Sequence, residues 1–216
     1  MIDYETETTE ELVEFLFTLT DGADVFLEVG ACEAEFSRRA AEQYPSASVI
    51  ALEANPYNFE AYAPTMPEGV TYLNAAACET DEPVTFQIMS VIRGAHVNQT
   101  AGNNGLRERT DSDIDYETVT VDGVRVDSVL RDRGLTAKRC VMWVDVEGAQ
   151  DRVIVGARAA LLSCQALIIE VEERAYWQGQ PLVDDVDAML GELGLVAVAR
   201  DFEFPYQHNR VYVPRT

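Results

Sequence analysis

The chain has 216 residues and carries 38 acidic side chains against 16 basic ones, a formal net charge of −22. DNA, RNA and anionic lipid repel such a polyanion, because binding to them rests on Lys and Arg that neutralise phosphates. With 47% hydrophobic and 9% aromatic residues, the chain has enough apolar surface to bury a core, which excludes intrinsic disorder. The length favours one domain over residues 1–216.

The acidic residues are spread along the sequence, and Lys138 is the only lysine among the basic residues. Such a surface is tolerated where salt screens its self-repulsion. We therefore expect a cytoplasmic protein adapted to a high-salt cytosol, with an ordinary acidic protein as the alternative. The N-terminus lacks a signal-peptide pattern, and no apolar run reaches the roughly 18 residues that a membrane span needs, so no integral membrane segment is expected.

The first third of the sequence alternates helix and strand patterns. Thr8 and Glu11 have capping-box spacing at the start of a helix over residues 8–20. Three strands and two helices follow, the strands at 25–29, 48–53 and 70–76 and the helices at 34–43 and from the Asn55-Pro56 pair. This alternation indicates a parallel α/β sheet.

A polar insert over residues 93–115 separates two further strands, 83–89 and 116–121. A long insert in a compact domain is typical of a functional loop, so we expect a lid that binds the substrate, with a mobile surface loop as the alternative. Its amides and glycines suit hydroxyl binding and movement: Asn98, Gln99, Asn103 and Asn104, with Gly94, Gly102 and Gly105. The remaining elements are helices at 127–134, 150–162 and 183–193 and strands at 140–146, 166–171, 195–199 and 210–213.

The four cysteines are widely spaced, at Cys32, Cys78, Cys140 and Cys164. None forms a CxxC pair, and only His96 and His208 are available to complete a metal set. A structural zinc site is therefore not expected.

Carboxylates crowd the predicted carboxyl ends of the strands, where open α/β sheets bind their ligands. The residues at these ends are Glu28, Gly30, Ala31 and Cys32, then Glu53, Ala54 and Asn55, then Asn74 and Ala75, then Asp145 and Glu147, then Glu170, Glu172 and Glu173. A nicotinamide dinucleotide needs a G-x-G-x-x-G turn for its pyrophosphate, and the chain lacks it. S-adenosylmethionine carries no phosphate and is cationic, so this edge favours it as the cofactor, with Glu53 placed to bind the ribose hydroxyls.

The segments VFLEVGACEAEF, ALEANP, LNAAAC, RVDSVL, WVDVEGAQDRVIVGARAALL and ALIIEVEE resemble the FkbM family of S-adenosylmethionine-dependent methyltransferases, over roughly residues 24–213. The resemblance implies a Rossmann-like class I methyltransferase fold, with a seven-stranded, mostly parallel sheet, an antiparallel last strand and helices on both faces. It also implies O-methylation of a hydroxyl on a sugar, glycolipid or natural-product intermediate, with S-adenosylhomocysteine as the second product.

The resemblance also assigns roles to individual residues. Its cofactor site comprises Glu28, Gly30 and Ala31 at the methionine part, Glu53 at the ribose, Asn74 and Ala75 at the adenine, and in addition Cys32, Ala54, Asn55 and Asp145. Asp145 and Glu147 match the acidic pair of the family's K-I-D-V-E-G block. Ala34 and Trp143 stand where the family commonly has glycine and lysine.

A hydroxyl acceptor also needs a base to remove its proton. The candidates are Asp145, Glu147, His208 and His96. A divalent metal on Asp145, Glu147 and Glu173 is possible but not favoured. Trp177 is a candidate for stacking on a sugar ring, with core packing as the alternative.

Other functions stay open. A carboxylate acceptor would use arginines of the insert, which are Arg93, Arg107 and Arg109. An amine acceptor and a non-catalytic protein that keeps the cofactor fold are further alternatives. The partner that we expect is a small-molecule or glycan/glycolipid acceptor and no nucleic acid, and a homodimer is possible.

Overall fold

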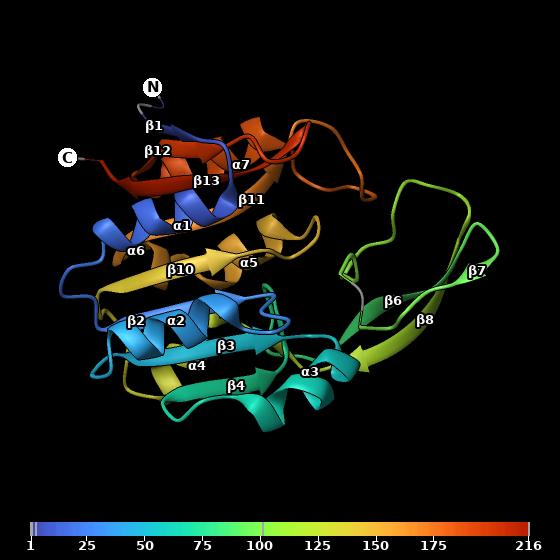
Figure 1. Cartoon of the computed structure of the whole chain (residues 1–216), viewed down its shortest axis with the longest axis horizontal. Helices are drawn as coiled ribbons and strands as arrows, with labels where there is room; N and C mark the ends of the chain where they lie inside the picture. The colour runs from blue at the N-terminus through green and yellow to red at the C-terminus, as the bar shows by residue number, and fades with distance from the viewer. Residues whose placement is uncertain (1, 3, 101, 216) are drawn as a thin grey trace.

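The computed structural model describes residues 2, 4–100 and 102–215. Its centre is an eight-stranded sheet in the order β1-β12-β13-β11-β10-β2-β3-β4 (Figure 1). The strands are β1 (Tyr4–Thr6), β2 (Val25–Val29), β3 (Ser48–Glu53), β4 (Val70–Asn74), β10 (Cys140–Val144), β11 (Cys164–Glu172), β12 (Leu195–Asp201) and β13 (Gln207–Pro214). β13 runs antiparallel to both of its neighbours, and the other neighbouring pairs are parallel.

The expected mostly parallel sheet with an antiparallel last strand is confirmed, but its expected count of seven strands is wrong. The eighth strand is β1, which pairs with β12 from Tyr4 opposite Ala199 to Thr6 opposite Asp201. Three residues are too few to show the alternation of apolar and polar side chains that identifies a strand in a sequence. This strand therefore follows from its pairing with a distant segment.

Helices cover both faces of the sheet, as expected. They are α1 (Thr9–Thr18), α2 (Glu35–Gln43), α3 (Pro56–Tyr62), a 3-10 turn (Ala63–Thr65), α4 (Val126–Asp132), α5 (Gln150–Gly156), α6 (Arg158–Leu162) and α7 (Val183–Glu192). α1 and α2 pack on one face, and α4 to α7 pack on the other (Figure 1). Because parallel strands are buried on both faces, they read as continuous apolar runs, and all five residues of β2 are buried.

The predicted helix starts are confirmed by their hydrogen bonds. The Glu11 amide donates to Thr8 Oγ1 at 3.3 Å, and the Thr8 amide donates to Glu11 Oε2 at 3.4 Å, which closes the capping box of α1. Asn55 Oδ1 accepts from the Tyr57 amide at 3.0 Å at the start of α3. Each of these caps is local in the sequence, which is why the sequence alone reveals it.

The single helix expected over residues 150–162 is wrong, because the segment forms α5 and α6 with a break at Ala157. Asp127 of α4 accepts hydrogen bonds from the amides of Ala159 at 3.0 Å and Ala160 at 2.9 Å. A carboxylate at a helix N-terminus satisfies amides that lack partners within the helix. The cap that starts α6 therefore comes from another helix, and local periodicity cannot show it.

A three-stranded antiparallel sheet projects from the central sheet (Figure 1). It consists of β6 (Val84–Ile92), β7 (Ala95–His96) and β8 (Ile114–Val121), and the short parallel pair β5 (Ala76–Ala77) and β9 (Gly123–Val124) connects it. We call residues 84–121 the arm. The insert expected over 93–115 lies inside the arm, and its Ala101 lies outside the described residues. The insert has regular pairing of its own, since β7 pairs with β6 and Gly105 bridges Gln87.

Within residues 2, 4–100 and 102–215, none of the helices combines the length and the apolar character that crossing a membrane demands. The cysteines are all free thiols, with Cys78, Cys140 and Cys164 buried and Cys32 half-buried.

Candidate active site

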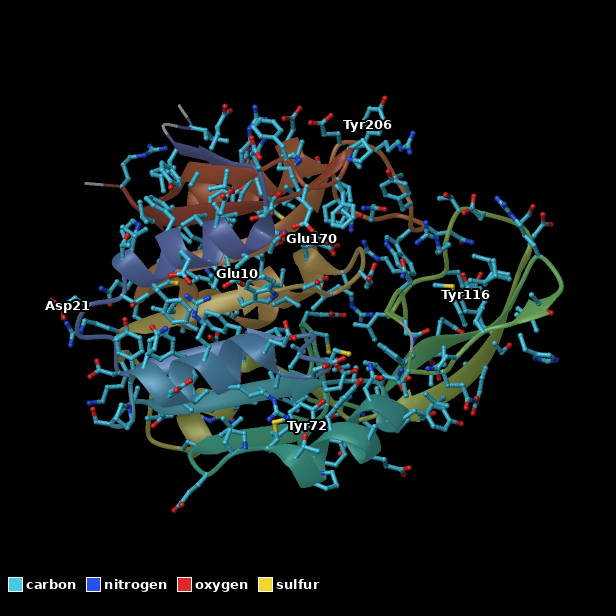
Figure 2. The ribbon with its side chains drawn as sticks, viewed as in Figure 1. Glu10, Asp21, Tyr72, Tyr116, Glu170 and Tyr206 are labelled. Atoms are coloured by element: carbon cyan, nitrogen blue, oxygen red, sulfur yellow. The ribbon has the colours of Figure 1, made fainter. Side chains whose placement is uncertain are left out.

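A cavity opens where β2, β3 and β10 end, and we call it the cofactor cavity. Eight of the predicted site residues line it, namely Gly30, Cys32, Glu53, Ala54, Asn55, Ala75, Asp145 and Glu147. Residues 102–104 and 106 of the arm line it from the other side. The strand ends face the arm in Figure 2, where Glu170 lies at the end of β11 and Tyr116 lies on the arm.

Gly30 is required by a close backbone approach. Its φ is +79°, and a Cβ atom there would lie 1.7 Å from the carbonyl oxygen of Asp145. Cys32 (φ 43°) and Ala34 (φ 57°) continue the turn in the left-handed region, where a residue with a Cβ is strained by roughly 1–2 kcal/mol. The conformation of Ala34 gives a physical reason for the glycine that the family commonly has at this position.

Glu53 is held by two backbone amides. Its Oε2 accepts from the Cys32 amide and its Oε1 from the Asn55 amide, both at 2.7 Å. The side chain is buried, and this burial raises its pKa. Both oxygens are therefore fixed at the cavity wall. Oε1 also accepts a long hydrogen bond from Asn58 Nδ2 at 3.5 Å, so Oε2 is the oxygen that keeps a lone pair for a further donor.

Asn55 and Asn74 have structural roles that the sequence did not show. The Asn55 amide nitrogen donates to the carbonyl oxygen of Gln99 in the arm at 2.7 Å. Asn74 does not line the cavity, and its side chain donates to the carbonyl oxygen of Glu53 at 2.8 Å. Asn74 therefore fixes the end of β3, whereas its neighbour Ala75 faces the cavity.

A second cavity, which we call the groove, shares Gly30, Cys32 and Asp145 with the first. Glu28 and Ala31, two of the predicted cofactor residues, line the groove and not the cofactor cavity. Glu28 accepts from the Ser37 amide at 2.8 Å, and burial raises its pKa to about 7.

Asp145 and Glu147 form a coupled acidic pair at the cofactor cavity. Burial raises the pKa of Asp145 to about 6, against a hydrogen bond with the Glu170 side chain that lowers it. Glu147 has a left-handed backbone (φ 49°), and its Oε1 accepts from the Asn103 amide at 3.0 Å. Burial and then the charge of Asp145 raise the pKa of Glu147 to about 8. Carboxyl groups with such pKa values exchange protons near neutral pH, as acid–base catalysis requires.

Glu170 and Glu172 extend this acidic pair, and the sequence analysis gave them no role. The β10–β11 register places Val144 opposite Ile169, so the next residues, Asp145 and Glu170, are neighbours. Glu172 is buried, its Oε2 accepts from Gln150 Nε2 at 3.3 Å, and burial raises its pKa to about 7. The strand register is the feature from which this contact could have been expected.

The second half of the insert is bound to the strand-end loops. Arg107 donates to the carbonyl oxygen of Gly148 at 2.6 Å and pairs with Asp151 at 2.8 Å. The Thr110 amide donates to the carbonyl oxygen of Tyr176 at 2.9 Å. Lid movement of this segment stays a prediction, and in this structure it would have to break these contacts.

The predicted hydroxyl-binding amides divide into two pairs. Asn103 and Asn104 line the cofactor cavity. Asn98 is exposed, and the Gln99 side chain donates to Glu117 at 2.6 Å. The arm therefore presents two of the four amides to the site.

Neither histidine lines the cofactor cavity or the groove. His96 is exposed on β7, in the projecting part of the arm. His208 is buried in β13 opposite Val171, its Nε2 accepts from Arg210 Nε at 3.0 Å, and burial lowers its pKa. The structure thus brings together the two predicted carboxylates and leaves the two predicted histidines apart from them.

Trp177 packs in the core, so the alternative of stacking on a sugar ring is wrong for this structure. Its exposed fraction is 1%. A Cβ atom on Gly148 would lie 2.5 Å from the Trp177 ring, so the ring and this loop are in close contact. The guanidinium of Arg109 lies 5.1 Å from the ring centroid, and its Nη1 donates to Asn103 Oδ1 at 3.0 Å.

In the part of the chain that the structure describes, no three or more His, Cys, Asp or Glu side chains are grouped so as to hold a metal ion. Glu173, the third predicted metal ligand, is exposed, and its backbone amide donates to the carbonyl oxygen of Tyr206 at 2.8 Å.

The doubly covered sheet with an acidic cavity at its strand ends is the architecture of enzymes that bind an adenosine cofactor at this edge. A family model described as "Methyltransferase FkbM domain" matches residues 24–197. The match spans most of the chain, so the protein belongs to the FkbM family of S-adenosylmethionine-dependent methyltransferases. The family resemblance is thereby confirmed.

Several solved structures are similar to the chain at low sequence identity. The N-terminal domain of EvdMO1 with S-adenosylhomocysteine bound is 11% identical (TM-score 0.51; 98% of this chain, 82% of that chain). A precorrin-6y C5,15-methyltransferase from Geobacter metallireducens GS-15 is 12% identical (TM-score 0.45; 98% and 94%). LepI in complex with S-adenosylmethionine is 11% identical (TM-score 0.45; 93% and 46%), so the chain spans about half the length of LepI. A search of curated proteins found no match.

Proposed function

We propose that the protein transfers the methyl group of S-adenosylmethionine to a hydroxyl of a sugar, glycolipid or natural-product intermediate. The observation that carries this proposal is the lining of the cofactor cavity. It combines Gly30, which has no side chain, with the carboxylates of Glu53 and Asp145. This set suits a cationic ligand that lacks phosphate, because carboxylates attract its charge and would repel a pyrophosphate. When bound, the cofactor supplies an electrophilic methyl group on a sulfonium.

Different residues of the lining would bind the ribose, the adenine and the methionine part of the cofactor. Glu53 would accept hydrogen bonds from the ribose hydroxyls, since both of its oxygens are already oriented by backbone amides. Ala75 and the apolar wall beyond it, which includes Ala76, Ala77 and Phe86, would contact the adenine. Gly30 and Asp145 border both cavities and would hold the methionine part, with Glu28 and Ala31 next to them in the groove.

Asp145 and Glu147 would take the proton of the acceptor hydroxyl. Glu147 lines the cofactor cavity and is fixed by the Asn103 amide. Its raised pKa of about 8 makes it a proton acceptor in mildly basic solution, whereas Asp145, with a pKa of about 6, is already ionised at neutral pH. Glu170, the neighbour of Asp145 on the adjacent strand, would orient it. We do not assign this role to His96 or His208, since neither borders the site.

A hydroxyl acceptor fits the lining better than a carboxylate acceptor. Of the three arginines of the insert, Arg93 is exposed next to β7 and Arg107 is bound to Gly148 and Asp151. Arg109 lies by Trp177 and Asn103, beside the acidic pair. One arginine among several buried carboxylates does not make a site for an anion.

We also propose that the protein works in a high-salt cytosol. The support is the excess of 38 acidic over 16 basic residues, which a salty solvent screens.

Calorimetric titration with S-adenosylmethionine tests the cofactor site. Glu53→Ala should weaken binding by about 1–3 kcal/mol, the scale of hydrogen bonds to a charged group, whereas Glu68→Ala, at an exposed position before β4, should leave it unchanged. Equal affinity in the wild type and Glu53→Ala would show that the ribose lies elsewhere. Methyl transfer from labelled cofactor into a fractionated extract at molar KCl would then identify the acceptor, and labelling on an atom other than oxygen would contradict the O-methylation.

A further inference from the structure

The groove has a lining of its own, which differs from that of the cofactor cavity. We propose that the groove binds the methyl acceptor and selects a hydroxyl compound with a flat apolar body and a protonated amine. This inference rests on the proposed function, because it takes the groove as the acceptor side of the same active site.

The position of the groove fits an acceptor. It shares Gly30, Cys32 and Asp145 with the cofactor cavity, so the two spaces meet where β2 and β10 end. The first turn of α1, the start of α2 and Glu203 of the β12–β13 turn form its walls. A compound in the groove therefore reaches the point where Asp145 borders both spaces.

The floor of the groove is apolar and aromatic. Val13, Phe36 and Trp143 form it, and the rings of Phe36 and Trp143 pack with centroids 5.9 Å apart. Phe36 and Val13 are buried, whereas Trp143 is half-buried and borders the open space. An indole face attracts an ammonium group more strongly than other aromatic rings do, so Trp143 offers both a flat surface and a partner for a cation.

The charges around this floor are almost all negative. Six carboxylates line the groove, those of Glu10, Glu28, Glu33, Glu35, Asp145 and Glu203, against the single guanidinium of Arg39. This ratio exceeds the 38 to 16 of the whole chain, so the groove is more acidic than the average surface. Glu10, labelled on α1 in Figure 2, lies on this side of the sheet.

Arg39 neutralises Glu10 and is already engaged, so it is not available to bind an anionic ligand. It is paired with Glu10 at 2.9 Å and with Glu14, and its guanidinium lies 4.7 Å from the centroid of the Phe17 ring. A phosphate or carboxylate on the acceptor would meet carboxylates without a free cation, whereas an ammonium group would be attracted. Salt screens the exposed rim charges, whereas the buried carboxyl group of Glu28, whose pKa is raised to about 7, adds a negative charge only where it is ionised.

The methyl transfer to such an acceptor accounts for every bond and proton. The acceptor oxygen gains the methyl group as the bond from that methyl to sulfur breaks, and the hydroxyl proton passes to a carboxylate of the Asp145–Glu147 pair. The amine stays protonated and serves only for recognition.

Two compounds with the same hydroxyphenyl body test the selection, tyramine with an ammonium group and 4-hydroxyphenylacetate with a carboxylate. Calorimetric titration of each into the protein saturated with S-adenosylhomocysteine should show tyramine binding at least tenfold more tightly. Trp143→Lys, which places a cation on the floor, should remove this preference, whereas Trp143→Phe should keep most of it. Equal binding of the two compounds, or tighter binding of the carboxylate, would overturn the proposal.

Two further measurements keep the result unambiguous. Glu203→Gln removes one rim charge and should weaken tyramine binding two- to fivefold, so it carries the test even if Trp143→Lys fails to fold. Displacement of S-adenosylhomocysteine by tyramine would place the amine in the cofactor's own space and overturn the assignment of the groove. Failure of the protein to bind S-adenosylhomocysteine at all would contradict the proposed function instead, and a separate titration without tyramine shows which of the two has failed.

Discussion

The cofactor cavity and the groove meet at Gly30 and Asp145, but they are built in different ways. The cavity is made from backbone and buried groups, since Gly30 leaves no room for a Cβ atom and two amides hold Glu53. The groove is made from side chains, with Trp143 on its floor and exposed carboxylates such as Glu203 on its rim. A single substitution can change the shape and charge of a site that is lined by side chains. A site that is lined by backbone changes its shape only when the fold changes. The comparison therefore links the cofactor to the fold and the acceptor to replaceable residues.

Gly30→Ala is the strongest test of the backbone-built cavity. The added Cβ atom would lie 1.7 Å from the carbonyl oxygen of Asp145, so β2 and β10 would have to separate where the cofactor binds. We expect loss of detectable S-adenosylmethionine binding in calorimetry and a decrease of at least about 4 kcal/mol in the free energy of unfolding, the range of severe core changes.

A matched glycine separates the clash from the backbone conformation. Gly194 has a φ of +80°, nearly that of Gly30, but a Cβ atom there would meet nothing within 4 Å. Gly194→Ala should lower the free energy of unfolding by only about 1 kcal/mol and leave cofactor binding intact. Similar losses in both variants would mean that conformation, and not the closeness of β2 and β10, requires glycine at position 30.

Lowering the pH should stabilise the protein, because the carboxylates beneath the two cavities are buried. The pKa values of Glu28 and Glu147 are raised to about 7 and about 8, above their unfolded values near 4.3. The folded chain then binds more protons than the unfolded chain between about pH 4.5 and 8, so the free energy of unfolding falls as the pH rises through this window. At about 1.4 kcal/mol per pKa unit, these two groups together predict a decrease of about 5 kcal/mol between pH 5.5 and 8.5 in urea unfolding.

Two glutamates of the groove provide the control for this pH dependence. Glu28→Gln removes a buried ionisable group and should flatten the slope, whereas Glu203→Gln removes an exposed rim charge and should leave it unchanged. Stability that rises with pH over the same window would contradict the burial of these carboxylates.

The sequence revealed the cofactor side of the molecule because its determinants are local. The strands 25–29 and 48–53, the Asn55 cap and the carboxylate at the end of each strand all depend on neighbouring residues, and the structure has these elements. A parallel strand buried on both faces is one apolar run, which makes its end easy to locate. The glycine turn after such a run then indicates where a ligand meets the backbone.

The features that the sequence did not reveal depend on partners that are distant along the chain. β1 exists through its pairing with β12, and the break before α6 depends on Asp127. The regular structure of the insert depends on the pairing of β6 with β7 and on the contacts of Arg107, which lie outside any local pattern. Trp143 and Glu203 line one groove although they are far apart in the sequence, and neither has a local pattern that predicts a shared cavity.

Salt should stabilise the folded chain, because it screens the repulsion between the exposed carboxylates. The formal net charge of −22 destabilises the folded chain through self-repulsion, which falls as the Debye length shortens from about 10 Å at 0.1 M salt to about 3 Å at 1 M. We expect the melting temperature to rise by about 6 °C between 0.1 and 2 M KCl, equivalent to about 2 kcal/mol for a chain of this size. A melting temperature that is flat in KCl would contradict adaptation to a high-salt cytosol.

The smallest expected effect concerns Ala34, in the turn whose residues line both cavities. Ala34→Gly relieves the left-handed conformation but loses a buried methyl group and adds freedom to the unfolded chain. These contributions nearly cancel, so the free energy of unfolding should change by less than about 0.5 kcal/mol. Ala31 packs in the same cluster without a positive φ, so Ala31→Gly has the losses without the relief and should lower stability by about 1–1.5 kcal/mol. The difference between the two variants measures the strain at Ala34, and equal losses would show that the turn holds alanine there without strain.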